Sequence, residues 1–185
     1  MPEKCLRLNR AKAGLLVIDI QEKLLPLIFE KDRLVQNCVR LIKAAQILGL
    51  PVFVTEQYRK GLGPTDQTVA AAVADFAPIE KVTFSSCGAE GLLPAMNDRG
   101  LTNLILCGIE AHVCVLQTCL DLLEENRSVF VVADAISSRD PENRRIALER
   151  MRSAGAEIVT VEMALFEMLG RAATDEFKQI LALLR

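Results

Sequence analysis

Apolar runs of strand length recur along this chain, and they constrain its fold more than any other feature. Each run is continuous rather than alternating, which is typical of a strand that is covered on both faces. The runs span residues 14–20, 51–55, 103–107, 129–133 and 157–161, with a shorter candidate at 79–84. All fall far short of the roughly 20 apolar residues of a membrane-spanning helix. We therefore expect no membrane association.

Helical patterns with recognisable ends separate several of these runs. One apolar stripe is followed by Gly49 and Pro51, which end helices. A second helix starts with Asp140 as its N-cap and Pro141 in its first turn, and it stops near Gly155. A third follows Thr174 and two acidic residues, and we expect it to dock on the core or on a neighbouring subunit. The first stripe consists of Leu34, Cys38, Leu41, Ala45 and Leu48, and the third of Phe177, Ile180, Leu181 and Leu184.

Strands that alternate with helices at this spacing predict right-handed βαβ units, with helices on both faces of an open sheet. We therefore predict an α/β protein with a three-layer αβα, Rossmann-like fold and a six-stranded, mainly parallel sheet. The length of 185 residues suits one domain over residues 1–185. The hydrophobic share of 51% is high enough to predict apolar surface for a subunit interface, and hence a homo-oligomer.

Charge and cysteine usage exclude several classes of protein. The formal net charge is −2 and the basic residues are scattered, so we expect no nucleic-acid binding. No glycine-rich phosphate loop follows the first apolar run, which argues against a nucleotide-binding module. The first residues lack the layout of a secretory signal, so we expect a cytoplasmic location. The six cysteines form no CxxC pair, which argues against a disulfide framework or a structural zinc site; they are Cys5, Cys38, Cys87, Cys107, Cys114 and Cys119.

Three polar residues lie at or just beyond the carboxyl ends of predicted strands: Asp19, Lys81 and Cys114. Each has an ordinary structural explanation. Asp19 could pair with a cation that stabilises the fold, Lys81 could be solvated, and Cys114 could be one more buried thiol. The segment after Gly108 reads as a strand-to-helix turn, which would place Cys114 in a first helical turn. There, free amides would favour the thiolate, lower its pKa from about 8.5 and stabilise an oxyanion.

The segment 56–65 is the most loop-like part of the chain, and it follows the second predicted strand. Because ligands of parallel α/β sheets bind beyond the carboxyl ends of strands, Gln57, Tyr58 and Arg59 are candidates to line a pocket. A loop that contacts another subunit is an equally good explanation.

Three phrases together resemble the isochorismatase-like cysteine hydrolase family over nearly the whole chain. They are Leu16-Val-Ile-Asp-Ile-Gln, Lys81-Val-Thr-Phe-Ser and Gly108-Ile-Glu-Ala-His-Val-Cys-Val. The likeness is greatest to uncharacterised isochorismatase domain-containing proteins. It implies a catalytic triad of Asp19, Lys81 and Cys114 and a small carbon–nitrogen-bonded substrate. Cys114 would attack the substrate to form a thioester-type intermediate, Asp19 would relay the proton and Lys81 would balance charge.

The resemblance also implies a non-proline cis peptide bond between Ile109 and Glu110. The backbone amides of Glu110 and Cys114 would then form the oxyanion hole. We further expect Gln57, Tyr58, Ile109, Glu110 and His112 to contact the substrate.

Two differences between this sequence and members of the family limit the functions that we expect of it. The Asp-x-His metal motif of nicotinamidases is missing after the second strand, so we expect no metal and no other cofactor. His112 is the only histidine, and a wall or interface position suits it better than the role of base for Cys114. A nucleophilic cysteine favours amide-like cleavage over the enol-ether hydrolysis of isochorismatase itself. The main alternative is a non-catalytic oligomeric scaffold that retains the hydrolase fold, and the reactivity of the Cys114 thiol separates the two.

Overall fold

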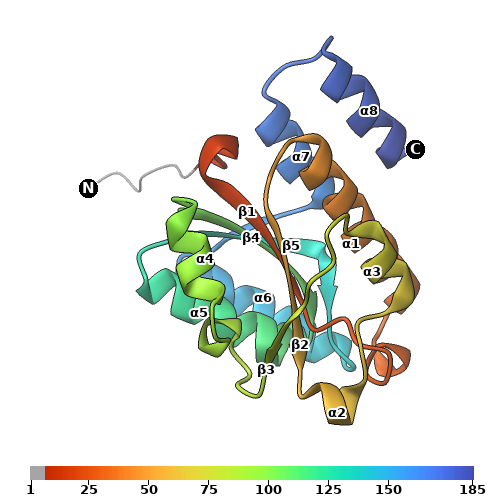
Figure 1. The fold of residues 1–185 in the computed structure, drawn as a ribbon, viewed down its shortest axis with the longest axis vertical. Coiled ribbons are helices and arrows are strands. Elements are labelled where there is room, and N and C mark those ends of the chain that lie inside the picture. Colours follow the sequence, from red (N-terminus) through yellow and green to blue (C-terminus); the bar gives the residue numbers. More distant parts are fainter. Residues whose placement is uncertain (1–6) are drawn as a thin grey trace.

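The computed structural model describes residues 7–185, so Cys5 lies outside the described part. Its centre is a six-stranded sheet with the strand order β3-β2-β1-β4-β5-β6, in which every pairing is parallel (Figure 1). The strands are β1 (Ala13–Ile18), β2 (Val52–Gln57), β3 (Ile79–Lys81), β4 (Asn103–Ile109), β5 (Ser128–Ser137) and β6 (Glu157–Val159). The predicted α/β class and six-stranded parallel sheet are confirmed.

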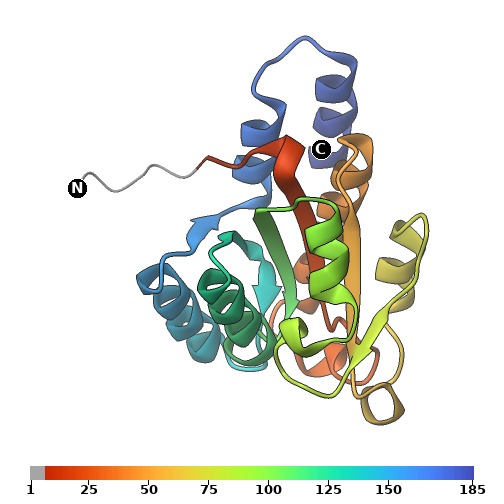
Figure 2. The same cartoon turned by 60° about the vertical axis from the view of Figure 1, so that its left-hand side comes forward.

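Helices cover both faces of the sheet and complete the three predicted layers. One face packs against α1 (Lys31–Ile47), α3 (Gln67–Ala72), α7 (Val161–Leu169) and α8 (Asp175–Leu184). The other packs against α4 (Leu92–Asp98), α5 (Leu116–Glu124) and α6 (Pro141–Ser153). In Figure 2, α5 and α6 lie to the left of the strands and α3 lies to the right. A further short helix, α2 (Arg59–Leu62), follows β2.

The continuous apolar runs of the sequence follow from this double cover. In β1, Leu15 and Val17 belong to the core under α1, whereas Leu16 and Ile18 belong to the core under α4 and α5. Because successive strand residues face opposite sides, a strand between two helical layers needs an apolar residue at every position.

The predicted helix ends agree closely with the structure. Asp140 caps α6 by accepting a hydrogen bond from the Glu142 amide (2.8 Å), and α6 starts at Pro141. Thr174 caps α8 in the same way, accepting from the Phe177 amide at 3.0 Å. The last helix docks on α1 and α7 of the same chain, with Ile180 buried.

The segment 56–65 is less irregular than its composition predicts. Glu56 and Gln57 still belong to β2, and Arg59–Leu62 form the single turn of α2. Tyr58 ends the strand with a positive φ of 39°, and its backbone carbonyl accepts hydrogen bonds from Gly61 and Leu62. The candidate strand at 79–84 is shorter than expected, because it ends at Lys81.

The order of the strands creates a crevice between β1 and β4. From β1 the chain first builds β2 and β3 on one side, and it later returns to build β4 on the other side. The helices that follow β1 and β4 therefore lie on opposite faces of the sheet. Ligands of such sheets bind in the crevice that this leaves at the carboxyl ends of the two strands. Gly108 is needed here: its φ is 120°, and a Cβ atom would lie 2.1 Å from the backbone oxygen of Ile18 on β1.

No helix within residues 7–185 has the length and apolar character required to cross a bilayer.

Candidate active site

Asp19 is the first residue beyond β1, and its buried carboxylate is the centre of the site. Its φ of 52° turns the chain out of the strand. One carboxylate oxygen, Oδ2, lies 2.6 Å from the Lys81 Nζ, and Oδ1 accepts a hydrogen bond from the Thr55 hydroxyl at 2.8 Å. Asp19 follows β1, Lys81 ends β3, and Thr55 lies two residues before the end of β2, so the neighbouring strands bring all three together near one edge of the sheet.

Lys81 is the last residue of β3, and its side chain is fully buried. Besides Asp19, its Nζ has the Gln57 Oε1 at 2.8 Å, the Phe84 carbonyl at 3.0 Å and the Thr83 carbonyl at 3.2 Å. An ammonium group has three N–H donors, so these four acceptors use its full capacity. Lys81 therefore orients Asp19 and has no donor left for a ligand.

Cys114 lies in a π-helical turn, Ala111–Val115, between β4 and α5, with only 6% of its surface exposed. Its thiol faces Asp19. Burial, and after it the Asp19 charge, raises the pKa of Cys114 to about 12, although Lys81 and the Glu110 amide act to lower it. The prediction of a lowered pKa was therefore wrong, because burial and a neighbouring carboxylate outweigh the amides of the turn. The resting group is a thiol.

Asp19 is correspondingly a better proton acceptor than an ordinary carboxylate. Burial raises its pKa, and the Lys81 ammonium and the Thr55 hydroxyl oppose that rise. A thiol that faces a basic carboxylate can react by transferring its proton as it attacks, without ever accumulating as a thiolate.

The turn that leads to Cys114 begins at Gly108 and contains a cis peptide bond between Ile109 and Glu110. The backbone amide of Glu110 is directed at the Cys114 sulfur, and this contact lowers the pKa of the thiol. An amide in that position is suitable for an oxyanion that forms next to the sulfur. That Glu110 and Cys114 supply the oxyanion donors remains a prediction.

Three of the residues predicted to contact the substrate, Gln57, Ile109 and His112, differ in burial and in hydrogen-bond partners. Both ends of the Gln57 amide are engaged, since its Oε1 accepts from Lys81 and its Nε2 donates to the Val82 carbonyl at 2.9 Å. Ile109 is fully buried in the core under α1. The half-buried His112 has its Nδ1 2.9 Å from the Ser138 hydroxyl.

The remaining two predicted contacts also have defined surroundings. The Glu110 carboxylate accepts hydrogen bonds from the Arg139 amide (3.0 Å) and from its Nε (3.1 Å). Tyr58 is exposed and lines a cavity of about 410 Å³, together with Arg59, Lys60, Glu80, Lys81, Val82, Gly88 and Glu90. The roles of these residues toward a substrate stay predictions.

Several buried polar residues of the site were not anticipated from the sequence. Thr55 bonds Asp19, its hydroxyl lies 3.5 Å from that of Ser86, and the Ser86 amide donates to the Thr118 hydroxyl at 2.8 Å. Gln21 joins the β1 and β2 ends, because its side chain bonds both the amide and the carbonyl of Gln57. The only signal for Thr55 was a polar residue that ends an otherwise apolar run.

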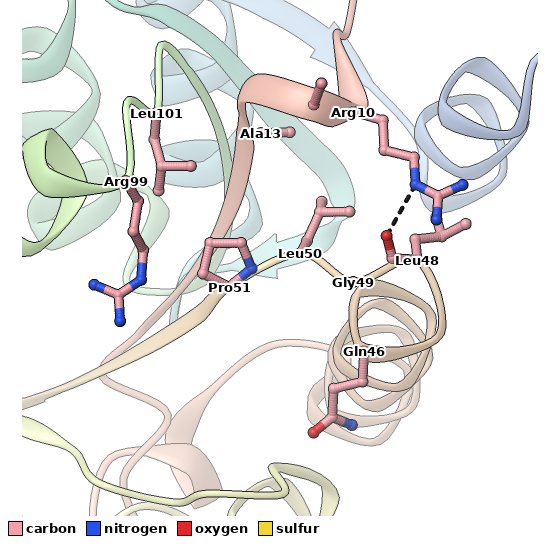
Figure 3. Close-up of a pocket in the computed structure, with 10 residues that line it drawn as sticks. Arg10, Ala13, Gln46, Leu48, Gly49, Leu50, Pro51, Arg99 and Leu101 are labelled. Carbon is pink, nitrogen blue, oxygen red and sulfur yellow. Dashed lines mark hydrogen bonds between the residues drawn. The ribbon is translucent and has the colours of Figure 1, made fainter.

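A separate cavity of about 630 Å³ lies at the opposite, amino-terminal edge of the sheet. Figure 3 shows Arg10 and Arg99 on either side of Leu50 and Pro51, with Arg10 donating to the Leu48 carbonyl (2.9 Å). Its lining contains none of the residues that surround Cys114. Within residues 7–185, no group of three or more His, Cys, Asp and Glu side chains is arranged to hold a metal ion.

A Rossmann-like sheet with a buried Cys-Asp-Lys cluster at its β1/β4 crevice defines the class of this protein. Comparison with known proteins then gives the family: the isochorismatase domain matches residues 13–163. The chain therefore belongs to the isochorismatase family. Membership supports a hydrolase-type function.

Individual relatives cover almost the whole chain. The zebrafish (Danio rerio) isochorismatase domain-containing protein 2 is 41% identical over 180 residues, covering 96% of this chain and 89% of the relative. A structure described as the MAR1 ribonuclease from Caenorhabditis elegans has a TM-score of 0.90 and 41% identity, covering 97% of this chain and 92% of that chain. The YcaC gene product from Escherichia coli, described as an octameric hydrolase of unknown specificity, has a TM-score of 0.87 and 28% identity, covering 98% and 89% of the two chains.

Proposed function

We propose that this protein is a cysteine-dependent hydrolase of small carbon–nitrogen-bonded, amide-like molecules, with Cys114, Asp19 and Lys81 as its catalytic residues. The observation that carries the proposal is the position of the Asp19 carboxylate. It faces the Cys114 thiol and at the same time lies 2.6 Å from the Lys81 ammonium.

In the first half-reaction, the Cys114 sulfur forms a bond to the carbonyl carbon while its proton passes to Asp19. The carbonyl oxygen becomes an oxyanion, for which the Glu110 and Cys114 amides are the proposed donors. Collapse of this intermediate breaks the carbon–nitrogen bond, and Asp19 returns the proton to the departing nitrogen. Ammonia or an amine leaves, and Cys114 retains the acyl group as a thioester.

In the second half-reaction, water attacks the thioester carbon and gives one proton to Asp19. The carbon–sulfur bond then breaks, and the sulfur takes the proton back from Asp19 as the carboxylic acid leaves. Every proton therefore moves through one carboxylate. Lys81 keeps that carboxylate oriented and electrically balanced in both halves.

The proposal includes a small-molecule substrate and assembly of several copies. Apolar side chains are exposed at Leu27 (61%) and Val82 (79%), which supports a contact between subunits. The octameric description of E. coli YcaC supports the same proposal.

The test is a panel of small primary amides, with ammonia release as the readout and acid-quenched mass spectrometry to find an acyl group on Cys114. We expect Cys114→Ser to lose the release and the adduct, and Cys87→Ser, a half-buried thiol outside the triad, to keep both. Release that survives in Cys114→Ser would overturn the proposal. If every amide is left intact and Cys114 is as inert as the buried Cys119, the scaffold alternative is correct.

An RNA substrate belongs in the same panel, because the nematode neighbour is described as a ribonuclease. We expect no RNA cleavage that depends on Cys114. Such cleavage would contradict the proposed amide-type chemistry directly.

A further inference from the structure

Thr55 holds Asp19 through both its backbone and its side chain. It lies on β2 opposite Ile18, the last residue of β1, so it is next to Asp19 across the parallel pair. The Asp19 amide donates to the Thr55 carbonyl at 3.2 Å, and the Thr55 hydroxyl donates to the Asp19 Oδ1 at 2.8 Å. Both residues are completely buried, where such bonds are stronger than in water. Thr55 therefore fixes the orientation of the carboxylate.

Within residues 7–185, the Asp19 carboxylate has three side-chain partners, which differ in the hydrogen bonds that they can make. They are the Lys81 ammonium from β3, the Thr55 hydroxyl from β2 and the Cys114 thiol from the turn after β4. The ammonium group only donates, and the thiol supplies the proton of the proposed reaction. A hydroxyl both donates and accepts, so Thr55 can bind Asp19 as a carboxylate and as a carboxylic acid.

The surroundings of the Thr55 hydroxyl allow it to turn. The Ser86 hydroxyl lies 3.5 Å from it, and either oxygen can be the donor. Ser86 is completely buried, and its amide donates to the Thr118 hydroxyl at 2.8 Å, which ties it to α5. When Asp19 takes the Cys114 proton on Oδ1, that proton can bond the Thr55 oxygen while the Thr55 proton turns toward Ser86. No O–H bond of Thr55 breaks in this exchange.

We propose that Thr55 is a positioning residue of the proposed reaction: its hydroxyl keeps Asp19 free to accept the Cys114 proton and then stabilises the protonated carboxyl group. The inference rests on the proposed function and adds a residue that acts through Asp19. Burial raises the pKa of Asp19, and the Lys81 and Thr55 bonds oppose that rise. Without the hydroxyl, Asp19 would keep its own proton to a higher pH and could not accept the proton of the thiol.

Thr55→Val tests this, because it removes the hydroxyl and keeps the shape of the side chain. The protonation of Asp19 is followed by NMR of protein labelled with carbon-13 at its aspartate carboxyl groups, and Asp19→Asn identifies the signal. We expect the Asp19 titration midpoint to rise by about one pH unit, because a hydrogen bond to the charged form is stronger than one to the neutral form. Thr55→Ser retains a hydroxyl and should restore the midpoint of the wild type.

Thr65→Val is the matched control. The buried Thr65 hydroxyl donates to a different buried carboxylate, that of Glu56, also at 2.8 Å. We expect this variant to lose a comparable bond and some stability toward urea, and to leave the Asp19 midpoint unchanged. A general loss of stability would therefore not produce the shift that we expect of Thr55→Val.

The pH dependence of ammonia release links the titration to the reaction. It is measured on an amide that the wild type hydrolyses. Because only the ionised form of Asp19 can accept the thiol proton, the rate should fall in acid as Asp19 becomes protonated. In Thr55→Val this fall should begin at a pH about one unit higher than in the wild type, matching the NMR midpoint.

The outcomes separate this inference from the proposed function. An Asp19 midpoint that stays in place in Thr55→Val, or that moves equally in Thr65→Val, would overturn the role of Thr55 and leave the cysteine chemistry intact. A midpoint that moves without a change in the pH dependence of ammonia release would overturn it as well. If the wild type releases ammonia from no amide, the proposed function fails, and the inference fails with it whatever the NMR titration shows.

Discussion

The Asp19 carboxylate and the Lys81 ammonium lie 2.6 Å apart across the ends of β1 and β3, although 62 positions separate them in the chain. Both side chains are almost completely buried, so each is the principal charge partner of the other. The Cys114 thiol faces the same carboxylate. One buried ion pair therefore governs both the stability of this edge and the proton that the proposed reaction transfers.

Removing the cation should be costly. In Lys81→Met the Asp19 carboxylate loses its partner in a buried place, and we expect the free energy of unfolding to fall by about 3–5 kcal/mol. Urea denaturation measures this. The double variant Asp19→Asn/Lys81→Met should recover much of the loss. The control is Lys178→Met, which breaks an exposed pair with Asp175 and should lower the free energy of unfolding by at most about 1 kcal/mol. Equal losses of stability in Lys81→Met and Lys178→Met would contradict the prediction.

Asp19→Asn should change activity and thiol reactivity in opposite directions. Loss of the proton acceptor should reduce amide hydrolysis by about 10²–10⁴-fold. Because the Asp19 charge raises the pKa of Cys114, its removal should lower that pKa, so alkylation at Cys114 should rise at a lower pH than in the wild type. The measurement is the pH profile of iodoacetamide labelling, and an unchanged profile would show that Asp19 does not act on the thiol.

Cys114 should make the folded protein less stable in alkali. Its folded pKa of about 12 lies above the ordinary value of 9.0, so the folded state keeps a proton that the unfolded state has lost. The stabilising contribution is complete below about pH 9 and is lost progressively as the pH rises toward 12. Cys114→Ala should therefore show a shallower decline in unfolding free energy over this range. The unfolding free energy at each pH is measured by denaturant titration. If it falls with pH as steeply in Cys114→Ala as in the wild type, the raised pKa of Cys114 is contradicted.

Gly108→Ala should destabilise the fold by more than backbone strain alone. Its φ is 120°, and the new methyl group would lie 2.1 Å from the Ile18 oxygen. Gly155→Ala is a matched control, because its φ is 107° but nothing lies within 4 Å of the added Cβ. We expect about 1–3 kcal/mol for the control and at least about 4 kcal/mol for Gly108→Ala, measured by thermal unfolding. Equal losses would mean that β4 can move away from β1.

The sequence by itself determined the architecture. Continuous apolar runs predicted strands covered on both faces, and the cap at Asp140 and the one at Thr174 predicted where two helices begin. These signals are local, because periodicity and capping depend on neighbours a few residues away. The positions of Asp19, Lys81 and Cys114 were also visible, since each lies at or just beyond the end of a predicted strand, and parallel strands end at a common edge.

Only the tertiary structure decided how these residues act on each other. The direction of the Cys114 pKa shift depends on burial and on the distance to Asp19, and neither has a signature near Cys114 in the sequence. Likewise, the sequence does not show that the Gln57 side chain bonds Lys81 or that the Glu110 carboxylate bonds Arg139. Desolvation and charge pairing act through space between separate strands, so they exist only once the sheet has brought those strands together.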